Sequence, residues 1–287
     1  MIEKEPSLTA RMVAQSRGLH LLLDDDPKIY EDTLAKPLAN FPDDEIWGVD
    51  NPIWHNALGI HLRAHAVCRS RFVEDCLSED KSISQYVILG AGLDSFAYRQ
   101  PAASDKLAVF EVDHPASQSW KKRRLNELGI SIPHNLHYIP VDFEHQQLND
   151  ALAKTSAFDQ KAPTLFSFLG VIFYLPKSIG LNTFKQIRSS VDGHCQLAMD
   201  IALSFDALKY DTDREELQGY IDMANSGNEP WVGLYTPDEI AQVLKSAGFE
   251  IDRDLNPRGI RERYLAGRSD ELSNNGFFHL ISAIGGG

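Results

Sequence analysis

A glycine turn carries the sharpest chemical signal in the chain. Gly90 and Gly92, with Ala91 between them, directly follow a short apolar run and precede a segment that we expect to be helical. Glycines at a strand-to-helix turn let backbone N–H groups come close to a ligand, because a Cβ atom would stand in the way. The turn therefore predicts a cofactor site, although a turn without a ligand stays an alternative.

The residues after the glycines indicate which cofactor fits. A dinucleotide turn would have a third glycine where this chain has Ser95, and Asp94 would put a negative charge beside a phosphate. That charge would cost on the order of 1 kcal/mol at an exposed site and more when buried. S-adenosyl-L-methionine has no phosphate and carries a sulfonium and an ammonium cation, so we favour it over NAD.

Carboxylates at the ends of the next two apolar runs could hold the rest of this cofactor. Asp113 follows the glycines by roughly 20 residues, where an acidic side chain can accept both ribose hydroxyl groups. Glu111 lies two residues earlier and on the same strand face. We favour Asp113 because ligands bind at the carboxyl ends of such strands. Asp142 and Phe143 offer a carboxylate for the adenine amino group and an apolar neighbour for its ring. Helix capping is the alternative role for these strand-end acids.

Alternating apolar runs and helical segments must position these residues. Strands that are buried on both faces are predicted at 86–90, 107–112, 136–141, 164–170 and 195–201. The helical segments between these runs predict a parallel sheet with crossover helices. A last apolar run, 277–284, predicts a closing strand.

The chain of 287 residues is predicted to form a single domain. Residues 1–80 should form an N-terminal helical cap, with the longest helix over 55–77. The cofactor-binding core is expected at 84–202, and a C-terminal helix with closing strands at 233–287. Residues 203–232 are polar and poorly periodic, which predicts a lid or insertion.

Composition argues against several classes of protein. The net charge is −13, and no dense basic stretch offers a footprint for nucleic acid. The basic run 121–124 is predicted to be the solvated face of a helix. The N-terminus lacks the apolar segment of a secretory signal, and the longest apolar stretch, 164–175, is shorter than the roughly 20 residues that span a bilayer. We expect a cytoplasmic protein, not bound to a membrane, that acts as a monomer or homodimer.

The cysteines and histidines predict no metal and no disulfide framework. Cys68, Cys76 and Cys195 form no C-x-x-C pair, and we interpret all three as small buried apolar side chains. The histidines form no compact ligand set apart from His61 and His65, which lack a recognised third ligand.

Several longer motifs occur in an order that resembles a known family. They are RSRFVED (69–75), VILGAGLDSFAYR (87–99), FEVDHP (110–115), PVDFE (140–144), FSFLGVIFYLP (166–176), EPW (229–231), SAGF (246–249) and RYLAGRSDEL (263–272). Together they resemble the leucine carboxyl methyltransferase superfamily, whose bacterial members include the polyketide-type O-methyltransferases. The resemblance covers nearly the whole chain from Leu8 onward.

This resemblance implies a fold and a cofactor. The fold is the class I methyltransferase fold, an α/β, Rossmann-like arrangement whose seven-stranded, mostly parallel sheet has helices on both faces, an N-terminal helical extension and a substrate-side insertion. By the same resemblance, Arg69 meets the methionine carboxylate of S-adenosyl-L-methionine, for which its bidentate fork is suited. Gly90 then lies against the cofactor, Asp113 holds the ribose, and Asp142 with Phe143 holds the adenine.

Two positions depart from the pattern of leucine carboxyl methyltransferases. Leu169 stands where those enzymes carry a glutamate, and Ala10 aligns with their lysine. We therefore expect transfer of a methyl group to a hydroxyl or carboxyl oxygen of a small organic molecule, polyketide-like or another secondary metabolite, with S-adenosyl-L-homocysteine as product. The alternatives are a catalytically degenerate protein that only binds the cofactor, and an NAD-linked oxidoreductase.

Four residues are predicted on the acceptor side. Tyr174 and Trp231 could wall an apolar pocket together with Tyr264, and Arg268 could anchor an acidic substrate. For each of them, packing or a structural salt bridge is the alternative. No catalytic residue is assigned: Tyr174 and His114, which stands beside the predicted ribose-binding acid, are the two groups considered, and a histidine in such a loop is more often structural.

Overall fold

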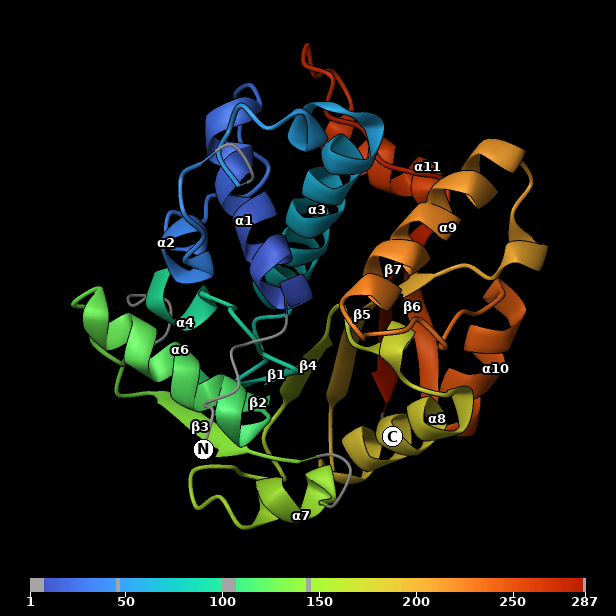
Figure 1. Ribbon diagram of the computed structural model, residues 1–287. Helices are drawn as coiled ribbons and strands as arrows, with labels where there is room; N and C mark the ends of the chain where they lie inside the picture. The colour runs from blue at the N-terminus through green and yellow to red at the C-terminus, as the bar shows by residue number, and fades with distance from the viewer. Residues whose placement is uncertain (1–7, 45–46, 100–106, 143–145, 286–287) are drawn as a thin grey trace.

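A seven-stranded sheet forms the centre of the molecule (Figure 1). The computed structural model describes residues 8–44, 47–99, 107–142 and 146–285. The strands are β1 (Gln85–Leu89), β2 (Ala108–Asp113), β3 (Leu136–Pro140), β4 (Thr164–Phe168), β5 (Cys195–Ala202), β6 (Phe249–Leu255) and β7 (Phe278–Gly285). Their order is β3-β2-β1-β4-β5-β7-β6, and only β7 runs antiparallel to its neighbours. This sheet confirms the predicted mostly parallel α/β fold.

Six of these strands lie where the apolar runs predicted them, and β6 is the exception. It lies at the edge of the sheet and pairs only with β7. Of its residues only Phe249 is buried, so its sequence has no apolar run to mark it. An edge strand with solvated side chains is a normal way to avoid pairing with other chains.

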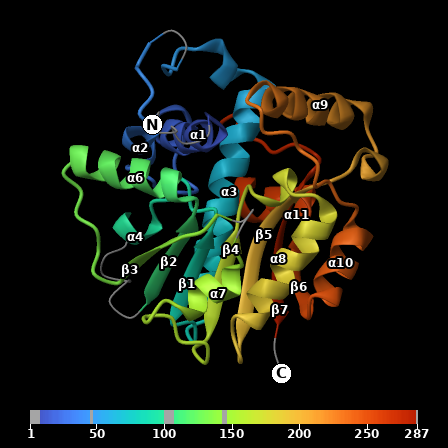
Figure 2. The ribbon, with the colours of Figure 1, turned by 60° about the horizontal axis from the view of Figure 1, so that its bottom comes forward.

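Helices cover both faces of the sheet, and the strands alternate between them. Val87 and Leu89 of β1 face the core beneath α7 (Leu148–Ala153), α8 (Lys177–Ser189) and α10 (Pro237–Ser246), which lie in front of the sheet in Figure 2. Tyr86 and Ile88 face the core beneath α3 (Ala57–Glu79), α4 (Phe96–Arg99) and α11 (Pro257–Ile260). Successive side chains of β1 thus point alternately into two apolar layers, one on each face of the sheet.

The N-terminal helices lie above the carboxyl ends of the strands (Figure 1). They are α1 (Leu8–Leu23), α2 (Ala35–Ala39) and the short η1 (Pro52–His55), and α1 packs against both α2 and α3. The long helix α3 begins after Asn56, whose side chain accepts a hydrogen bond from the N–H of Gly59 at 3.0 Å. This cap separates η1 from α3 and starts the helix two residues later than the pattern predicts.

The segment 203–232 is more regular than its sequence suggests. It contains the turn η3 (Phe205–Ala207) and the helix α9 (Asp211–Ser226). Leu217, Tyr220 and Ala224 lie at helical spacing and are buried, so the expectation of poor periodicity was wrong. Charged residues on the other side of α9 raise the average polarity of the segment, so the narrow apolar stripe is not apparent from composition alone.

The cysteines and the apolar character of the helices can be described directly from the structure. Cys68, Cys76 and Cys195 are free and buried, as predicted. Among the described residues, the helices include none that is long and apolar enough to cross a membrane.

Candidate functional site

The glycine turn between β1 and α4 is fixed by hydrogen bonds to β2. Gly90 and Gly92 have φ values of 65° and 48°, which glycine adopts without strain. The N–H groups of Gly90 and Ala91 donate to the carbonyl of Val112 at 2.9 and 3.2 Å. The N–H of Gly92 donates to Oδ2 of Asp113 at 2.5 Å. A Cβ atom on Gly90 would lie 2.5 Å from Val171 Cγ2, so a side chain at position 90 would have to displace Val171.

These hydrogen bonds correct the expectation that the N–H groups of the turn approach the ligand. Their donors are occupied by Val112 and Asp113, both from the end of β2. A pyrophosphate is held by free N–H donors at such a turn, whereas this turn presents carboxylates. The turn therefore suits a cofactor without phosphate groups that carries positive charge.

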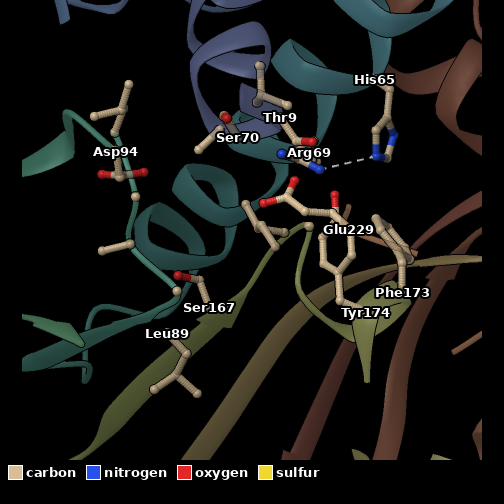
Figure 3. Close-up of a pocket in the computed structure, with 18 of the residues that line it drawn as sticks. Thr9, His65, Arg69, Ser70, Leu89, Asp94, Ser167, Phe173, Tyr174 and Glu229 are labelled. Carbon is tan, nitrogen blue, oxygen red and sulfur yellow. Dashed lines mark hydrogen bonds between the residues drawn. The ribbon is translucent and has the colours of Figure 1, made fainter. Parts of the chain in front are cut away.

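A cavity of about 280 Å³ lies over this turn. It opens at the carboxyl ends of β1 and β4, where the strand order reverses, which is the usual binding place in open α/β sheets. Figure 3 shows side chains from several segments converging on it. Among the predicted site residues, the cavity is lined by Arg69, Gly90, Ala91, Gly92, Asp113, Tyr174 and Trp231.

Arg69 belongs to a buried network on one wall of this cavity. Its Nη1 donates to Oδ2 of Asp200 at 2.9 Å, and Oδ1 of Asp200 accepts the N–H of Gly170 at 2.7 Å. A Cβ atom on Gly170 would lie 2.8 Å from the Arg69 guanidinium, so glycine is needed for this packing. Burial would raise the pKa of Asp200, but Arg69, His65 and the N–H of Gly170 together lower it. Asp200 thus stays charged and anchors the guanidinium.

His65 completes the network and was not predicted as a site residue. Its Nε2 lies 2.8 Å from Oδ2 of Asp200, and its ring stacks on Phe278 with centroids 3.6 Å apart. Burial lowers the pKa of His65, although Asp200 acts in the opposite direction. A signal existed in the sequence: Asp200 lies near the end of a predicted strand, as Asp113 does, and His65 lies one helical turn before Arg69.

Asp113 and Glu111 have separate environments although they share a strand face. Asp113 lines the cavity, and burial raises the pKa of its carboxyl group. Glu111 is fully buried away from the cavity, and its Oε2 accepts a hydrogen bond from Lys121 Nζ at 2.7 Å. Burial raises the pKa of Glu111 to about 7, against the charge of Lys121. Glu111 is therefore placed as the partner of a helix lysine rather than as a cofactor ligand.

The position of Lys121 corrects another expectation. Its helix α6 (Pro115–Glu127) turns this side chain inward, where it is 1% exposed. The run 121–124 is accordingly not a wholly solvated face. Placing the lysine beside a carboxylate offsets the cost of burying its charge.

Two further predicted residues do not line the cavity, and a third is not among the described residues. His114 is exposed and caps α6, its Nδ1 lying 3.2 Å from the N–H of Ala116. Asp142 is half-buried after β3, and its N–H donates to Oε1 of Gln146 at 2.9 Å. Phe143 lies outside the described residues. The expected adenine contacts of Asp142 and Phe143 therefore stay predictions.

Aromatic side chains form the wall opposite the glycine turn. The ring of Trp231 lies 4.7 Å from that of Phe173, 5.9 Å from that of Tyr220 and 6.5 Å from that of Tyr174. Phe278 closes the same group, 6.0 Å from Trp231. Burial raises the pKa of Tyr174, so its phenol stays protonated at neutral pH. This wall comes from the short helix η2 (Ile172–Tyr174) after β4, from the first residue of β7, from α9 and from residues 229–231.

Tyr264 and Arg268 lie in other contacts, away from the cavity. The hydroxyl of Tyr264, in the short helix η4 (Arg261–Leu265), donates to Oδ2 of Asp75 at 2.9 Å. Arg268 donates to the carbonyls of Pro27 and Asp25, both at 2.7 Å. Their expected roles in binding substrate are not supported by these positions.

The two histidines noticed as a pair also have separate partners. His61 Nδ1 lies 2.6 Å from Oε1 of Glu216, whereas His65 contacts Asp200. Within the described part of the chain, no group of three or more His, Cys, Asp or Glu side chains could hold a metal ion.

Comparison with known proteins places the chain in a family. The sequence model of the leucine carboxyl methyltransferase family matches residues 10–188. The chain belongs to this family. It is similar to YktD of Bacillus subtilis (strain 168), which is named provisionally as an S-adenosyl-L-methionine-dependent methyltransferase, with 31% identity over 99% of both chains. A protein of Mycobacterium sp. (strain JLS) with the same provisional name is 34% identical over 86% of this chain and 82% of its own.

Solved structures show the same fold. A duf574 family protein from Streptomyces avermitilis has a TM-score of 0.64 at 15% identity, with 97% of both chains covered. A protein from Thermobifida fusca, provisionally named a methyltransferase, has a TM-score of 0.62 at 14% identity, with 100% of this chain and 97% of its own covered. The chain is thus a class I methyltransferase of the leucine carboxyl methyltransferase family, with S-adenosyl-L-methionine as its cofactor.

Proposed function

We propose that this methyltransferase transfers a methyl group to a hydroxyl or carboxyl oxygen of a small organic molecule, polyketide-like or another secondary metabolite. The observation that carries the proposal is one cavity that joins the glycine turn to an aromatic wall. The turn and the carboxylates suit the cofactor, and the aromatic wall suits an apolar acceptor beside it. The size of the cavity favours a small acceptor over a protein surface.

The cofactor would be held by residues on three elements. Arg69 would meet the methionine carboxylate; this is supported by its place in the cavity wall and by Asp200, which anchors its guanidinium. Asp113 would accept the ribose hydroxyl groups, and Gly90 would give the cofactor close access to the backbone. When bound, the cofactor supplies an activated methyl group on its sulfonium.

The acceptor would be aligned mainly by shape. Methyl transfer from a sulfonium needs an in-line approach and the exclusion of water. Tyr174, Tyr220 and Trp231 enclose the space beside the turn, and Met223 of α9 lies in the same wall. The segment 203–232 would then act as the lid of the acceptor side, since it contributes Tyr220, Met223 and Trp231 from outside the sheet.

The test begins with calorimetric titration of S-adenosyl-L-methionine and S-adenosyl-L-homocysteine. Wild-type protein should bind both with micromolar affinity, and Asp113→Ala should weaken binding by about tenfold or more, as expected for a lost charged hydrogen bond. A folded wild-type protein that binds neither compound would refute the cofactor site.

A second step tests the acceptor. Protein loaded with methyl-labelled cofactor is incubated with fractionated small-molecule extracts, and we expect label in an ether or ester of low molecular mass. Cofactor binding without turnover in any fraction would favour a catalytically degenerate member of the family, because Leu169 replaces a glutamate in the cavity wall.

A further inference from the structure

Glu229 is a charged residue of the cavity to which the proposed function gives no task. Its side chain lines the cavity, and its Oε2 atom is buried without a hydrogen-bond partner among the described residues. A buried carboxylate oxygen in that state is costly, because nothing replaces the water it has lost. The atom is therefore arranged for a donor that a ligand brings.

The other carboxylates of the cavity wall already have partners. Oδ1 of Asp94 accepts the N–H of Phe96 at 2.8 Å. Both carboxylate oxygens of Asp113 accept backbone N–H groups, at 2.5 and 2.6 Å. Among the cavity-lining carboxylates in the described ranges, Glu229 is thus the one with a buried, unpaired oxygen.

Glu229 and Arg69 face the same part of the cavity. Figure 3 shows both charged groups turned toward the space beside the hydroxyl of Tyr174. Burial raises the pKa of Tyr174 most; the charge of Glu229 also raises this pKa, and that of Arg69 lowers it. Because Asp200 anchors Arg69 from behind, the wall of this cavity offers a ligand both a guanidinium and a carboxylate.

This pair of charges complements an α-amino acid group, which carries a carboxylate and an ammonium on one carbon atom. The methionine part of the cofactor ends in such a group. The strand that leads into the glycine turn offers no acid, since Ile88 and Leu89 line the cavity there. The carboxylate for the ammonium must then come from another element, and Glu229 reaches the cavity from the segment after α9.

We propose that Glu229 binds the ammonium group of the cofactor's methionine part, opposite the carboxylate that Arg69 binds. The inference rests on the proposed function, because it assumes that this cavity holds the cofactor. It also gives the segment 229–231 two tasks. Glu229 would serve the cofactor, and Trp231, two residues later, belongs to the aromatic wall of the acceptor side.

The experiment compares three ligands by calorimetry: S-adenosyl-L-homocysteine, its deaminated analogue that keeps the carboxylate, and methylthioadenosine, which lacks the amino acid part. Glu229→Gln should weaken binding of S-adenosyl-L-homocysteine by about 10- to 100-fold, because a charged hydrogen bond is lost. Binding of the other two ligands should change less than about twofold. Glu215→Gln, at an exposed position of α9, is the matched control and should leave all three affinities unchanged.

Wild-type protein supplies a test that depends on no variant. It should bind the deaminated analogue about 10- to 100-fold more weakly than S-adenosyl-L-homocysteine. Equal affinities of the wild-type protein for these two ligands would overturn the inference. It would also be overturned if Glu229→Gln weakened the binding of S-adenosyl-L-homocysteine and of its deaminated analogue by the same factor. Normal binding by this variant with loss of methyl transfer would also overturn it and assign Glu229 to the acceptor. A wild-type protein that binds none of these ligands would instead refute the proposed function.

Discussion

Two arginine clusters along α3 resemble each other in composition but differ in position. Arg69 lines the cavity and pairs with Asp200 behind it; their side chains are 10% and 0% exposed. Arg263 pairs with Asp75 away from the cavity, where the corresponding values are 34% and 12%. Both clusters include charged hydrogen bonds to an aspartate. Ion pairing alone therefore does not identify a binding site. What distinguishes Arg69 is its position at the carboxyl ends of the strands, where the cavity lies.

The largest expected difference between the clusters is in stability. Asp200→Asn leaves the guanidinium of Arg69 buried without its countercharge, so the free energy of unfolding should fall by about 3–5 kcal/mol. Asp75→Asn should cost about 1–2 kcal/mol, because the groups that it leaves unpaired are partly solvated. Chemical denaturation of both variants measures the two values. Equal losses would show that the clusters do not differ in the way their burial indicates.

The next effect is on cofactor binding. Arg69→Lys keeps the charge but loses the planar fork, so the affinity for S-adenosyl-L-homocysteine should fall by about tenfold. The matched change in the other cluster, Arg263→Lys, should leave that affinity unchanged. Calorimetry on both variants decides the comparison, and a similar loss in each would contradict the division between a binding and a structural cluster.

A third difference concerns pH. Burial holds the pKa of His65 below its ordinary 6.5. Between the two values the unfolded chain binds a proton that the folded chain does not, so stability falls as pH is lowered through this window. His65→Gln should remove this component, which is at most about 1.4 kcal/mol per pH unit. Denaturation curves between pH 7 and about pH 5 test the slope, and identical slopes for variant and wild type would refute the assignment.

The smallest effect is expected at Tyr264, which was predicted as a substrate residue. Tyr264→Phe removes the hydrogen bond from its hydroxyl to Asp75, so stability should fall by about 1 kcal/mol. Cofactor binding and methyl transfer should be unchanged. A loss of transfer with unchanged stability would return Tyr264 to the acceptor side and weaken the contrast between the two clusters.

The cofactor side of the site was largely predictable because its residues follow local rules. The glycine turn and Asp113 come at the ends of buried strands, and the sheet itself places such ends together. The same rules also predicted Glu111 as a cofactor-binding residue, and this prediction is not supported. The alternation of a strand puts Glu111 and Asp113 on one face but does not show how far along the strand a ligand reaches. The separate roles of Glu111 and Asp113 depend on Lys121 of α6, which no local pattern pairs with either of them.

The acceptor side was less predictable because it is assembled from distant segments. Trp231 and Tyr174 were expected near the substrate and line the cavity, whereas Tyr264 and Arg268, which looked equivalent, do not. Tyr220 was hidden in a helix whose average polarity concealed its apolar stripe.

The mostly parallel sheet, the glycine turn after its first strand and the kind of cofactor were predictable from the sequence, because strand periodicity, glycine conformation and charge act over short stretches of chain. Only the packing of the whole chain brings Arg69, with Asp200 behind it, and Glu229 to one cavity. These residues come from a helix before the sheet, a central strand and the segment after α9, and only packing of the whole chain sets their burial and hence the strength of their charges.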